Sequence, residues 1–357
     1  MITNVYAKMK IFHFKSQLDL LTKDKNKIVS PIHVRIKPTN LCNHNCWYCS
    51  YRMPKLQLGK NMKTTDYIPK QKIVEIICDL KEMGVKAVTF SGGGEPFCYP
   101  YFIEAINKLV QVGIPFASLT NGVKLDGKIA EIFADYGSWL RVSMDGFNDR
   151  SYARSRNVPQ GEFTRVMENI KRFKKMRSKC RIGVSLIIDA SSVLHVYSFI
   201  KKMKDIGIDN VKLSPCIVSD HAADNIEYYK NIYGRLRREF EKAMTTLRDD
   251  NFEIFDSFYG LNETFEKDYF WCPYIQILPV IGADLNVYSC QDKAYNCRAG
   301  LIGSIKKKRF KDFWFNGKSK FFKINPHLHC KHHCVANSKN KLILEYLNVD
   351  RKHMAFV

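Results

Sequence analysis

The sequence predicts an α/β protein built on a parallel sheet, and two observations support this prediction. Between residues 32 and 247, short apolar runs alternate with longer segments whose apolar residues recur at helical spacing. A helix follows each strand, which is the connection that parallel strands with right-handed crossovers require. The expected strands are 33–37, 87–91, 116–120, 140–143, 182–188 and 211–214, and the expected helices are 70–83, 101–112, 128–136, 162–176, 193–206 and 223–247. Such a sheet is closed or nearly closed as a barrel.

The remaining segments suggest a division of the chain into four parts. In the expected helix 70–83, the first of the alternating strands and helices, the apolar face consists of Ile73, Ile76, Ile77 and Leu80. Residues 1–30 are polar apart from an amphipathic patch at 11–21, so we expect an N-terminal extension with a leading helix outside the core. Residues 31–250 form the barrel. After them, β-like runs at 275–281 and 286–290 predict a hairpin in a small unit of residues 251–337, followed by a C-terminal helix or tail at 338–357.

Composition limits the classes of partner. The formal net charge of +22 favours an anionic partner, although much of it lies where solvated helix faces are expected. A nucleic acid is the less favoured partner, because no run interleaves aromatic and basic residues as single-strand binders do. No apolar run approaches the roughly 20 residues needed to span a bilayer. We therefore expect a cytoplasmic protein without a membrane partner, whose 12 cysteines are metal ligands or buried thiols rather than disulfides.

Three cysteines in one loop predict a metal centre. Cys42, Cys46 and Cys49 stand in a C-x3-C-x2-C array directly after the first strand. Thiolate ligands select zinc, copper(I) or iron–sulfur clusters. A structural zinc site normally has four protein ligands, so this array leaves one position open unless His44 fills it.

Other chemically informative residues follow the strands, at the edge where the active sites of α/β barrels lie. The second strand leads into a glycine run that ends in Gly93, Gly94 and Glu95, and this run would let backbone approach a ligand closely. A plain strand-to-helix turn would also explain the glycines. Ser143 and Asp145 alternate onto one face where the fourth strand ends, and Cys216 comes just after the sixth.

The C-terminal part carries enough cysteines for a second site. Two of them flank the expected hairpin and two close the segment at the end, namely Cys272, Cys290, Cys330 and Cys334. Cys297 is either spare or replaces one of the four. A zinc ribbon is the alternative, with His329, His332 or His333 as further ligands.

The cysteine array, with Tyr48 directly before Cys49 and a preceding Lys-Pro-Thr-Asn segment, resembles the radical S-adenosylmethionine (SAM) superfamily. The resemblance covers roughly residues 32–335. It implies a partial (β/α)6 barrel like a TIM barrel, with a [4Fe–4S] cluster held by the three cysteines and its fourth iron bound by SAM. Electron transfer into SAM then gives a 5′-deoxyadenosyl radical that abstracts hydrogen from the substrate. The C-terminal cysteines resemble the auxiliary-cluster extension of the family, of the SPASM or the shorter twitch type, and imply a second [4Fe–4S] cluster.

The resemblance also assigns roles to single residues. Gly93, Gly94 and Glu95 correspond to the segment that holds the amino group of SAM, and Tyr48 is the aromatic residue of the cluster loop. Ser143 and Asp145 correspond to residues that bind the SAM nucleoside. Arg156 stands where relatives often bind the methionine carboxylate, although Arg154 is close enough in sequence to take that role.

The expected function is hydrogen abstraction from a substrate carbon, with dehydrogenation or epimerisation of a sugar, an aminocyclitol or a nucleotide-linked sugar. The partners would be a small anionic substrate and an electron donor such as flavodoxin or ferredoxin. In an epimerisation, Cys216 would donate hydrogen to the substrate radical; an ordinary buried thiol is its alternative role. Two other functions stay open: maturation of a peptide or protein side chain, and a zinc-stapled nucleic-acid-binding protein without redox chemistry.

Overall fold

The computed structural model describes residues 7–258, 261, 265–350, 352–353 and 355–356. The expected N-terminal extension, C-terminal unit and tail therefore each fall in part outside the described residues. One curved ten-stranded sheet runs through the molecule in the order β10-β9-β8-β1-β2-β3-β4-β5-β6-β7. All neighbours from β8 to β7 are parallel, and β9 is antiparallel to β8 and β10. This mostly parallel α/β sheet is consistent with the expected partial barrel.

All six predicted strands are present. They are β1 (His33–Ile36), β2 (Ala87–Phe90), β3 (Phe116–Thr120), β4 (Trp139–Ser143), β5 (Arg181–Ile188) and β6 (Asn210–Pro215). Four further strands extend the sheet: β7 (Glu253–Asp256), β8 (Val280–Ile281), β9 (Asn286–Tyr288) and β10 (Leu301–Ser304). Strands β8 and β9 form the predicted hairpin, whereas β7 and β10 were not predicted. Because β8 pairs with β1, the C-terminal hairpin continues the barrel sheet on one side, while β7 continues it on the other.

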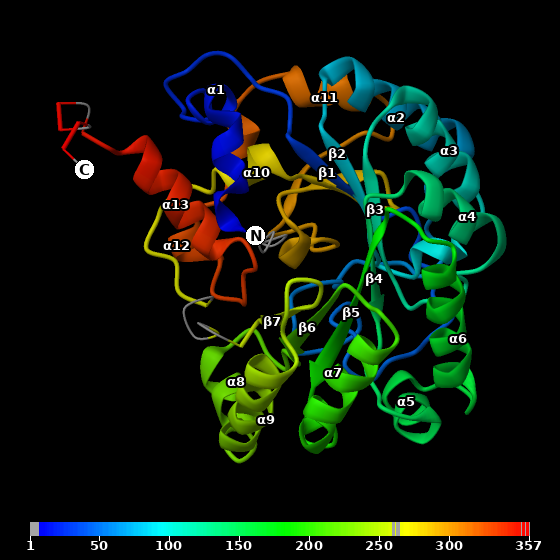
Figure 1. Ribbon diagram of the computed structural model, residues 1–357. Coiled ribbons are helices and arrows are strands. Elements are labelled where there is room, and N and C mark those ends of the chain that lie inside the picture. The colour runs from blue at the N-terminus through cyan, green and yellow to red at the C-terminus, as the bar shows by residue number, and fades with distance from the viewer. Residues whose placement is uncertain (1–6, 259–260, 262–264, 351, 354, 357) are drawn as a thin grey trace.

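Helices cover the outer side of the sheet, as Figure 1 shows. They are α2 (Lys70–Met83), α3 (Phe102–Val112), α4 (Gly127–Tyr136), α5 (Asp149–Arg156), α6 (Glu162–Lys175), α7 (Val196–Asp205), α8 (Ala222–Tyr229) and α9 (Tyr233–Thr246). The predicted apolar face of α2 is confirmed, because all four of its residues are fully buried. Each such side chain stabilises the fold by about 1.5–3 kcal/mol. Helices α2 and α3 both end at a glycine in the left-handed conformation, Gly84 and Gly113, which an L residue would adopt less readily.

Several predicted elements were wrong in detail. The long helix expected at 223–247 is broken into α8 and α9, and α5 was not predicted. The run at 275–281 begins with the helical turn α10 (Tyr274–Ile277), so only its last two residues form a strand. The leading helix consists of a 3-10 segment (Lys8–Phe14) and the single turn α1 (Lys15–Leu18).

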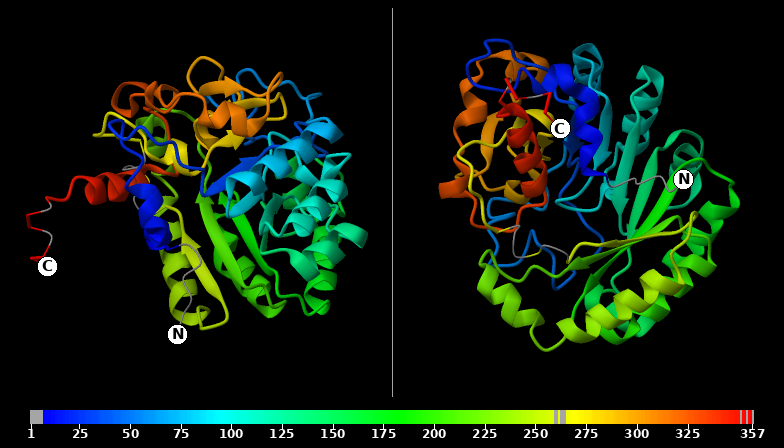
Figure 2. Two further views of the ribbon diagram at one scale, coloured as in Figure 1. Left: turned by 90° about the horizontal axis from the view of Figure 1, so that it is seen from above. Right: turned by 60° about the vertical axis from the view of Figure 1, so that its left-hand side comes forward.

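The C-terminal helices complete the molecule. They are α11 (Phe310–Phe315), α12 (Pro326–His329) and α13 (Asn337–Leu347). The two views in Figure 2 place α1 and α13 on the open side of the curved sheet, away from the outer helices. Hydrogen bonds tie these distant segments together: Trp314 Nε1 donates to the Val29 carbonyl at 2.8 Å, and Gln276 Nε2 donates to the Leu21 carbonyl at 2.8 Å. The N-terminal segment is thus fixed against the C-terminal part of the chain.

Candidate active site

The predicted cysteine array forms one tight loop after β1. The backbone amide of Cys49 donates to the Cys46 carbonyl at 3.2 Å, and the amide of Arg52 donates to the Cys49 carbonyl at 2.8 Å. Cys42, Cys46 and Cys49 are free thiols and partly exposed. Burial, and to a smaller extent the other two thiols, raise the pKa of Cys42 to about 12. Thiol ligands lose their protons when a metal binds.

His44 is turned away from this set. Its Nε2 lies 2.8 Å from a carboxylate oxygen of Glu162, at the start of α6, and burial lowers its pKa to about 3. Its Nδ1 has no partner among the described residues. The contact with Glu162 occupies the nitrogen at the tip of the ring, which disfavours His44 as a fourth metal ligand.

The glycine run packs directly on the cysteine loop. The Gly94 amide donates to the Thr39 carbonyl at 3.1 Å, and the Glu95 amide donates to the Leu41 carbonyl at 2.9 Å. A Cβ on Gly94 would lie 2.0 Å from the Leu41 carbonyl oxygen, so only glycine allows this approach. The glycine predicted to serve the cofactor therefore also has a structural role, since it sets the distance between the two loops.

Glu95 connects the glycine run with the end of β3. Its carboxylate accepts hydrogen bonds from Thr120 Oγ1 at 2.7 Å, the Asn121 amide at 2.7 Å and the Phe97 amide at 3.1 Å. Burial raises the pKa of Glu95, and these three hydrogen bonds oppose the rise. The Asn121 side-chain amide in turn donates to Asn43 Oδ1 in the cysteine loop at 2.7 Å. The ends of β2 and β3 thus hold the cysteine loop from one side.

Asp145 holds the loop from the other side. Its Oδ2 accepts from the Tyr48 hydroxyl at 2.5 Å and lies 2.5 Å from Arg156 Nη2, while its Oδ1 accepts from the Ile187 amide at 2.7 Å. The Asp145 and Arg156 side chains are 4% and 5% exposed. Burial raises the pKa of Tyr48 well above its usual value, so the phenol stays protonated and donates.

Helix α5 brings Arg156 to this position. Asn148 and Ser151 form a capping box that begins the helix, and the helix ends at Arg156. The Arg156 carbonyl accepts from the Asn45 amide of the cysteine loop at 3.1 Å. Arg154 is exposed, so the structure brings Arg156 and not Arg154 to the predicted site.

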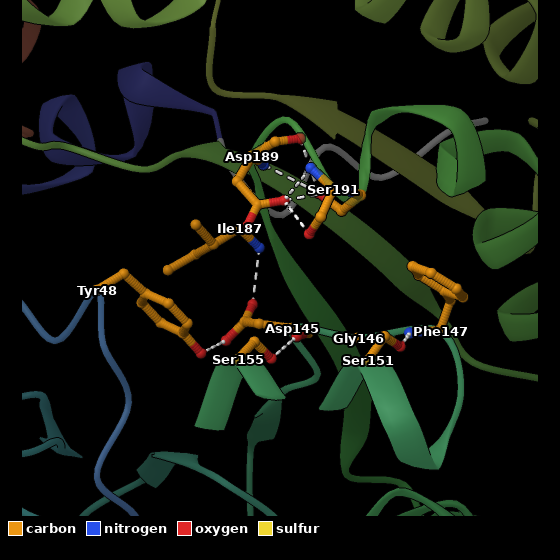
Figure 3. A pocket seen from close by; sticks show the side chains of 10 residues that line it. Tyr48, Asp145, Gly146, Phe147, Ser151, Ser155, Ile187, Asp189 and Ser191 are labelled. Atoms are coloured by element: carbon orange, nitrogen blue, oxygen red, sulfur yellow. Dashed lines mark hydrogen bonds between the residues drawn. The ribbon is translucent and has the colours of Figure 1, made fainter. Parts of the chain in front are cut away.

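A pocket opens beside the Asp145 cluster at the carboxyl ends of β4 and β5 (Figure 3). It is lined by Tyr48, Asp145, Gly146, Phe147, Ser151, Ser155, Ile187, Asp189, Ser191 and Ser192. Ser143 is not among these described lining residues. Its hydroxyl lies 3.5 Å from Ser185 Oγ, on the inner face of the sheet. The structure thus brings Tyr48, Asp145 and Arg156 together, whereas Ser143 lies outside the described lining of the pocket, against Ser185.

Lys37 belongs to the site and was not predicted. Its fully buried Nζ donates to the Gly92 carbonyl at 2.5 Å and to the Tyr51 hydroxyl. Burial lowers the pKa of this lysine, and Arg35 acts in the same direction. The sequence feature that could have indicated it is its position at the end of the strand, directly before Pro38 and the cysteine loop.

The four C-terminal cysteines also come together. Cys272, Cys290, Cys330 and Cys334 line one pocket, which Lys267, Lys293, His332 and Asn340 share. Burial, and next the nearby Cys330, raise the pKa of Cys272 to about 12. Cys297 is exposed and is not among the described lining residues. His329 accepts from the Asn325 amide at 3.1 Å, and His333 packs against Phe265. Only His332 of the three expected alternative ligands therefore faces the thiols.

Neither cysteine set has the geometry of a site for a single ion. Among the described residues, no group of three or more histidine, cysteine, aspartate or glutamate side chains could hold one metal ion. The donor sets themselves, three and four free thiols, are those that iron–sulfur clusters use.

Comparison with known proteins identifies the domain around the cysteine loop. Residues 36–189 match the model of the radical SAM superfamily. The match lies within this part of the chain, and a radical SAM domain implies a [4Fe–4S] cluster and SAM as cofactors. The free thiols of Cys42, Cys46 and Cys49 fit the cluster.

Curated relatives match only part of this chain. A GTP 3′,8-cyclase of Vibrio atlanticus is 25% identical over 48% of this chain and 51% of its own length. The dTDP-4-amino-4,6-dideoxy-D-glucose ammonia-lyase of Streptomyces venezuelae is 26% identical over 51% of this chain and 38% of its own length. An S-adenosylmethionine-dependent nucleotide dehydratase of Flammeovirga pacifica is 28% identical over 30% of this chain and 36% of its own length. The chain thus spans about half or less of these relatives.

Solved structures share the fold over most of the chain. SuiB of Streptococcus suis, bound to its precursor peptide SuiA, has a TM-score of 0.62 at 15% identity and covers 82% of this chain and 66% of its own. The structure of anSMEcpe with bound AdoMet has a TM-score of 0.56 at 19% identity and covers 85% of this chain and 89% of its own. Among the described residues, no helix is both long and apolar enough to cross a bilayer.

Proposed function

We propose that this protein is an enzyme that cleaves SAM reductively and removes a hydrogen atom from a substrate carbon. The observation that carries the proposal is the cysteine loop, whose three free thiols are fixed between the glycine run and the Asp145 cluster. When bound, the cluster and SAM supply the reductive cleavage and the 5′-deoxyadenosyl radical. The protein supplies placement and excludes water.

The Asp145 cluster is suited to hold the nucleoside of SAM. A carboxylate has about four lone-pair positions. In Asp145, Oδ2 already accepts from Tyr48 and Arg156, whereas Oδ1 accepts from the Ile187 amide alone among the described residues. Oδ1 can therefore accept one ribose hydroxyl, and Ser143 can offer a second contact. We propose that Gly93, Gly94 and Glu95 position the methionine end, with Arg156 near its carboxylate.

For the substrate, we propose a sugar, an aminocyclitol or a nucleotide-linked sugar that is dehydrogenated or epimerised. The names of the three curated relatives all refer to nucleotides or a nucleotide-linked sugar. Peptide or protein side-chain maturation is the second candidate, because SuiB, whose fold this chain shares, was solved with a precursor peptide. The four C-terminal thiols would hold an auxiliary [4Fe–4S] cluster, which could accept the second electron in a dehydrogenation, and flavodoxin or ferredoxin would be the reductant.

Deuterium transfer tests the proposed reaction. The anaerobically reconstituted protein, supplied with reductant, SAM and a candidate substrate deuterated at carbon, should produce deuterated 5′-deoxyadenosine, measured by mass spectrometry. Sugar nucleotides should transfer the label and peptides should not. A protein that binds zinc, lacks the brown absorption of iron–sulfur clusters and forms no 5′-deoxyadenosine would contradict both enzymatic proposals.

The role of Cys216 distinguishes a proposed epimerisation from a proposed dehydrogenation. The residue follows β6 and is 2% exposed, and burial raises the pKa of its thiol to about 12. Asp189 and Asp145, which both line the pocket described above, are the charges that act on this thiol. It is thus a neutral S–H group that could donate hydrogen to a substrate radical. If it does, Cys216→Ala should stop product formation while 5′-deoxyadenosine still forms; unchanged product formation would show that Cys216 is only a buried thiol.

A further inference from the structure

Three basic residues share the inner face of the curved sheet. Along β4, Trp139, Arg141 and Ser143 alternate onto one face. The strand register extends this face in both directions, because Ser143 pairs with Ser185, which pairs with Lys212 of β6, while Trp139 pairs with Ala117, which pairs with Thr89, which pairs with Arg35 of β1. Arg35, Arg141 and Lys212 therefore project from three different strands toward the same side, opposite to the outer helices.

Solvent reaches this face. The residues that alternate with them, such as Val34, Leu140 and Val211, are at most 1% exposed because they pack under the outer helices. Arg35, Arg141 and Lys212 are each partly exposed instead. Part of each side chain is therefore open to a ligand, while the Nε atoms of Arg35 and Arg141 are buried.

Cations outnumber carboxylates on this face. Burial, followed by Arg141, Lys339 and Arg35, lowers the pKa of Lys212 to about 8, so these cations lie near one another. Asp292 is the carboxylate that opposes them at Lys212, at Arg35 and at Lys37. Among the described residues, Arg35 and Lys212 form no ion pair with a carboxylate, and Arg35 Nε has no hydrogen-bond partner. Cations gathered in partly buried surroundings are costly unless an anion joins them.

The site has the right position for a substrate. The strand rise places Arg141 roughly 13 Å along β4 from Asp145. Lys212 stands level with Ser143, two strands away, and so lies about 7 Å below Asp145 along the strand direction. A molecule whose anionic end contacts these cations would extend toward the carboxyl edge of the sheet. There the proposed SAM pocket and Cys216 lie.

We propose that Arg35, Arg141 and Lys212 form the binding site for the phosphate groups of the substrate. This inference rests on the proposed function and narrows it to phosphorylated or nucleotide-linked substrates. Two guanidinium forks and one ammonium group match the geometry and charge of a phosphate or diphosphate better than a single carboxylate, which needs only one partner.

Calorimetric titration of inorganic pyrophosphate into the reconstituted holoenzyme, at fixed physiological ionic strength, tests the site. The wild-type chain should bind one equivalent. Arg35→Met and Lys212→Met should each weaken binding about ten- to a hundredfold, the range expected when a charge-assisted hydrogen bond is lost. Lys212→Arg should keep most of the affinity. Lys201→Met is the matched control, because that lysine is an exposed residue of α7 paired with Asp205.

Four results would overturn the proposal: no saturable binding, full affinity in Arg35→Met and Lys212→Met, an equal loss in Lys201→Met, or saturable binding of an aspartate-rich tripeptide in place of pyrophosphate. Melting curves of each variant show whether it is folded, and Lys212→Arg keeps the test decisive if Lys212→Met is not. 5′-Deoxyadenosine formation is measured in parallel on the wild type. If 5′-deoxyadenosine forms but pyrophosphate does not bind, the proposed phosphate site is wrong and the proposed radical chemistry stands. If pyrophosphate binds but no 5′-deoxyadenosine forms, the phosphate site stands and the proposed radical chemistry is wrong.

Discussion

Cys46→Ala should abolish 5′-deoxyadenosine formation and lower the iron content of the reconstituted protein by about half. Cys46 lies between the other two cysteines of the loop, and its carbonyl accepts the turn-forming hydrogen bond from Cys49. The substitution removes one of three thiolates and leaves the backbone of the turn in place. A cluster with only two protein ligands would not be retained, whereas the C-terminal thiols would keep the proposed auxiliary cluster. Iron analysis measures the iron content, and chromatography of the SAM cleavage products measures 5′-deoxyadenosine formation.

Cys78→Ala is the matched control for this prediction. Cys78 is a partly exposed thiol in α2, far in sequence from both cysteine sets. Its loss should leave iron content and SAM cleavage at wild-type values. The assignment of the loop fails if Cys46→Ala retains all of its iron, or if Cys78→Ala loses as much as Cys46→Ala.

The sequence predicted those parts of the fold that repeat. Helix α2 and the strand after it were evident, because the apolar residues of the helix recur with a period of about 3.6 residues and a glycine marks its end. Helix α5 was missed, since Tyr152 and Arg156 alone are buried in it and no apolar stripe results. The sequence feature that could have predicted this helix is Asn148 three residues before Ser151. This is a capping pair in which serine replaces the usual glutamate or glutamine.

Long-range pairing set the rest of the fold. Strand β8 is two residues long, and its parallel partner β1 lies far away in the sequence, so no local pattern could reveal it. The break between α8 and α9 falls at residues 230–232 without a proline or glycine to mark it. Tertiary packing overrides helix propensity at such a place.

The site was predictable in its residues and not in its contacts. Spacing identified Cys42, Cys46 and Cys49, because ligands of one loop are close in sequence. The contacts of Glu95 with Asn121 and of Asp145 with Tyr48 join residues from different strands, and only the folded sheet brings their ends together. The cations of the inner face are separated by more than 170 residues, from Arg35 to Lys212. Polar and apolar residues alternate along their strands, but only the strand register shows that the polar faces lie on one side of the sheet.

Arg156→Met should destabilise the protein by about 3–5 kcal/mol, because it leaves the Asp145 carboxylate buried without its cation. Both side chains are almost fully buried, so solvent does not screen the pair. The double variant with Asp145→Asn should recover part of the loss, since a neutral amide needs no counter-charge. Chemical denaturation under anaerobic conditions measures the free energy of unfolding of the wild type, the two single variants and the double variant.

The same series tests whether the pair serves SAM as well as the fold. Arg154→Met is the control, because Arg154 is an exposed neighbour in α5 and its loss should change neither stability nor SAM affinity. If Arg156 contacts the methionine carboxylate, the double variant should bind SAM more weakly than Asp145→Asn alone, even where its stability has been restored. Stability and affinity that recover together would show instead that Arg156 acts only by holding Asp145 and the cysteine loop in place. Additive losses in the double variant would mean that Asp145 and Arg156 do not depend on each other at all.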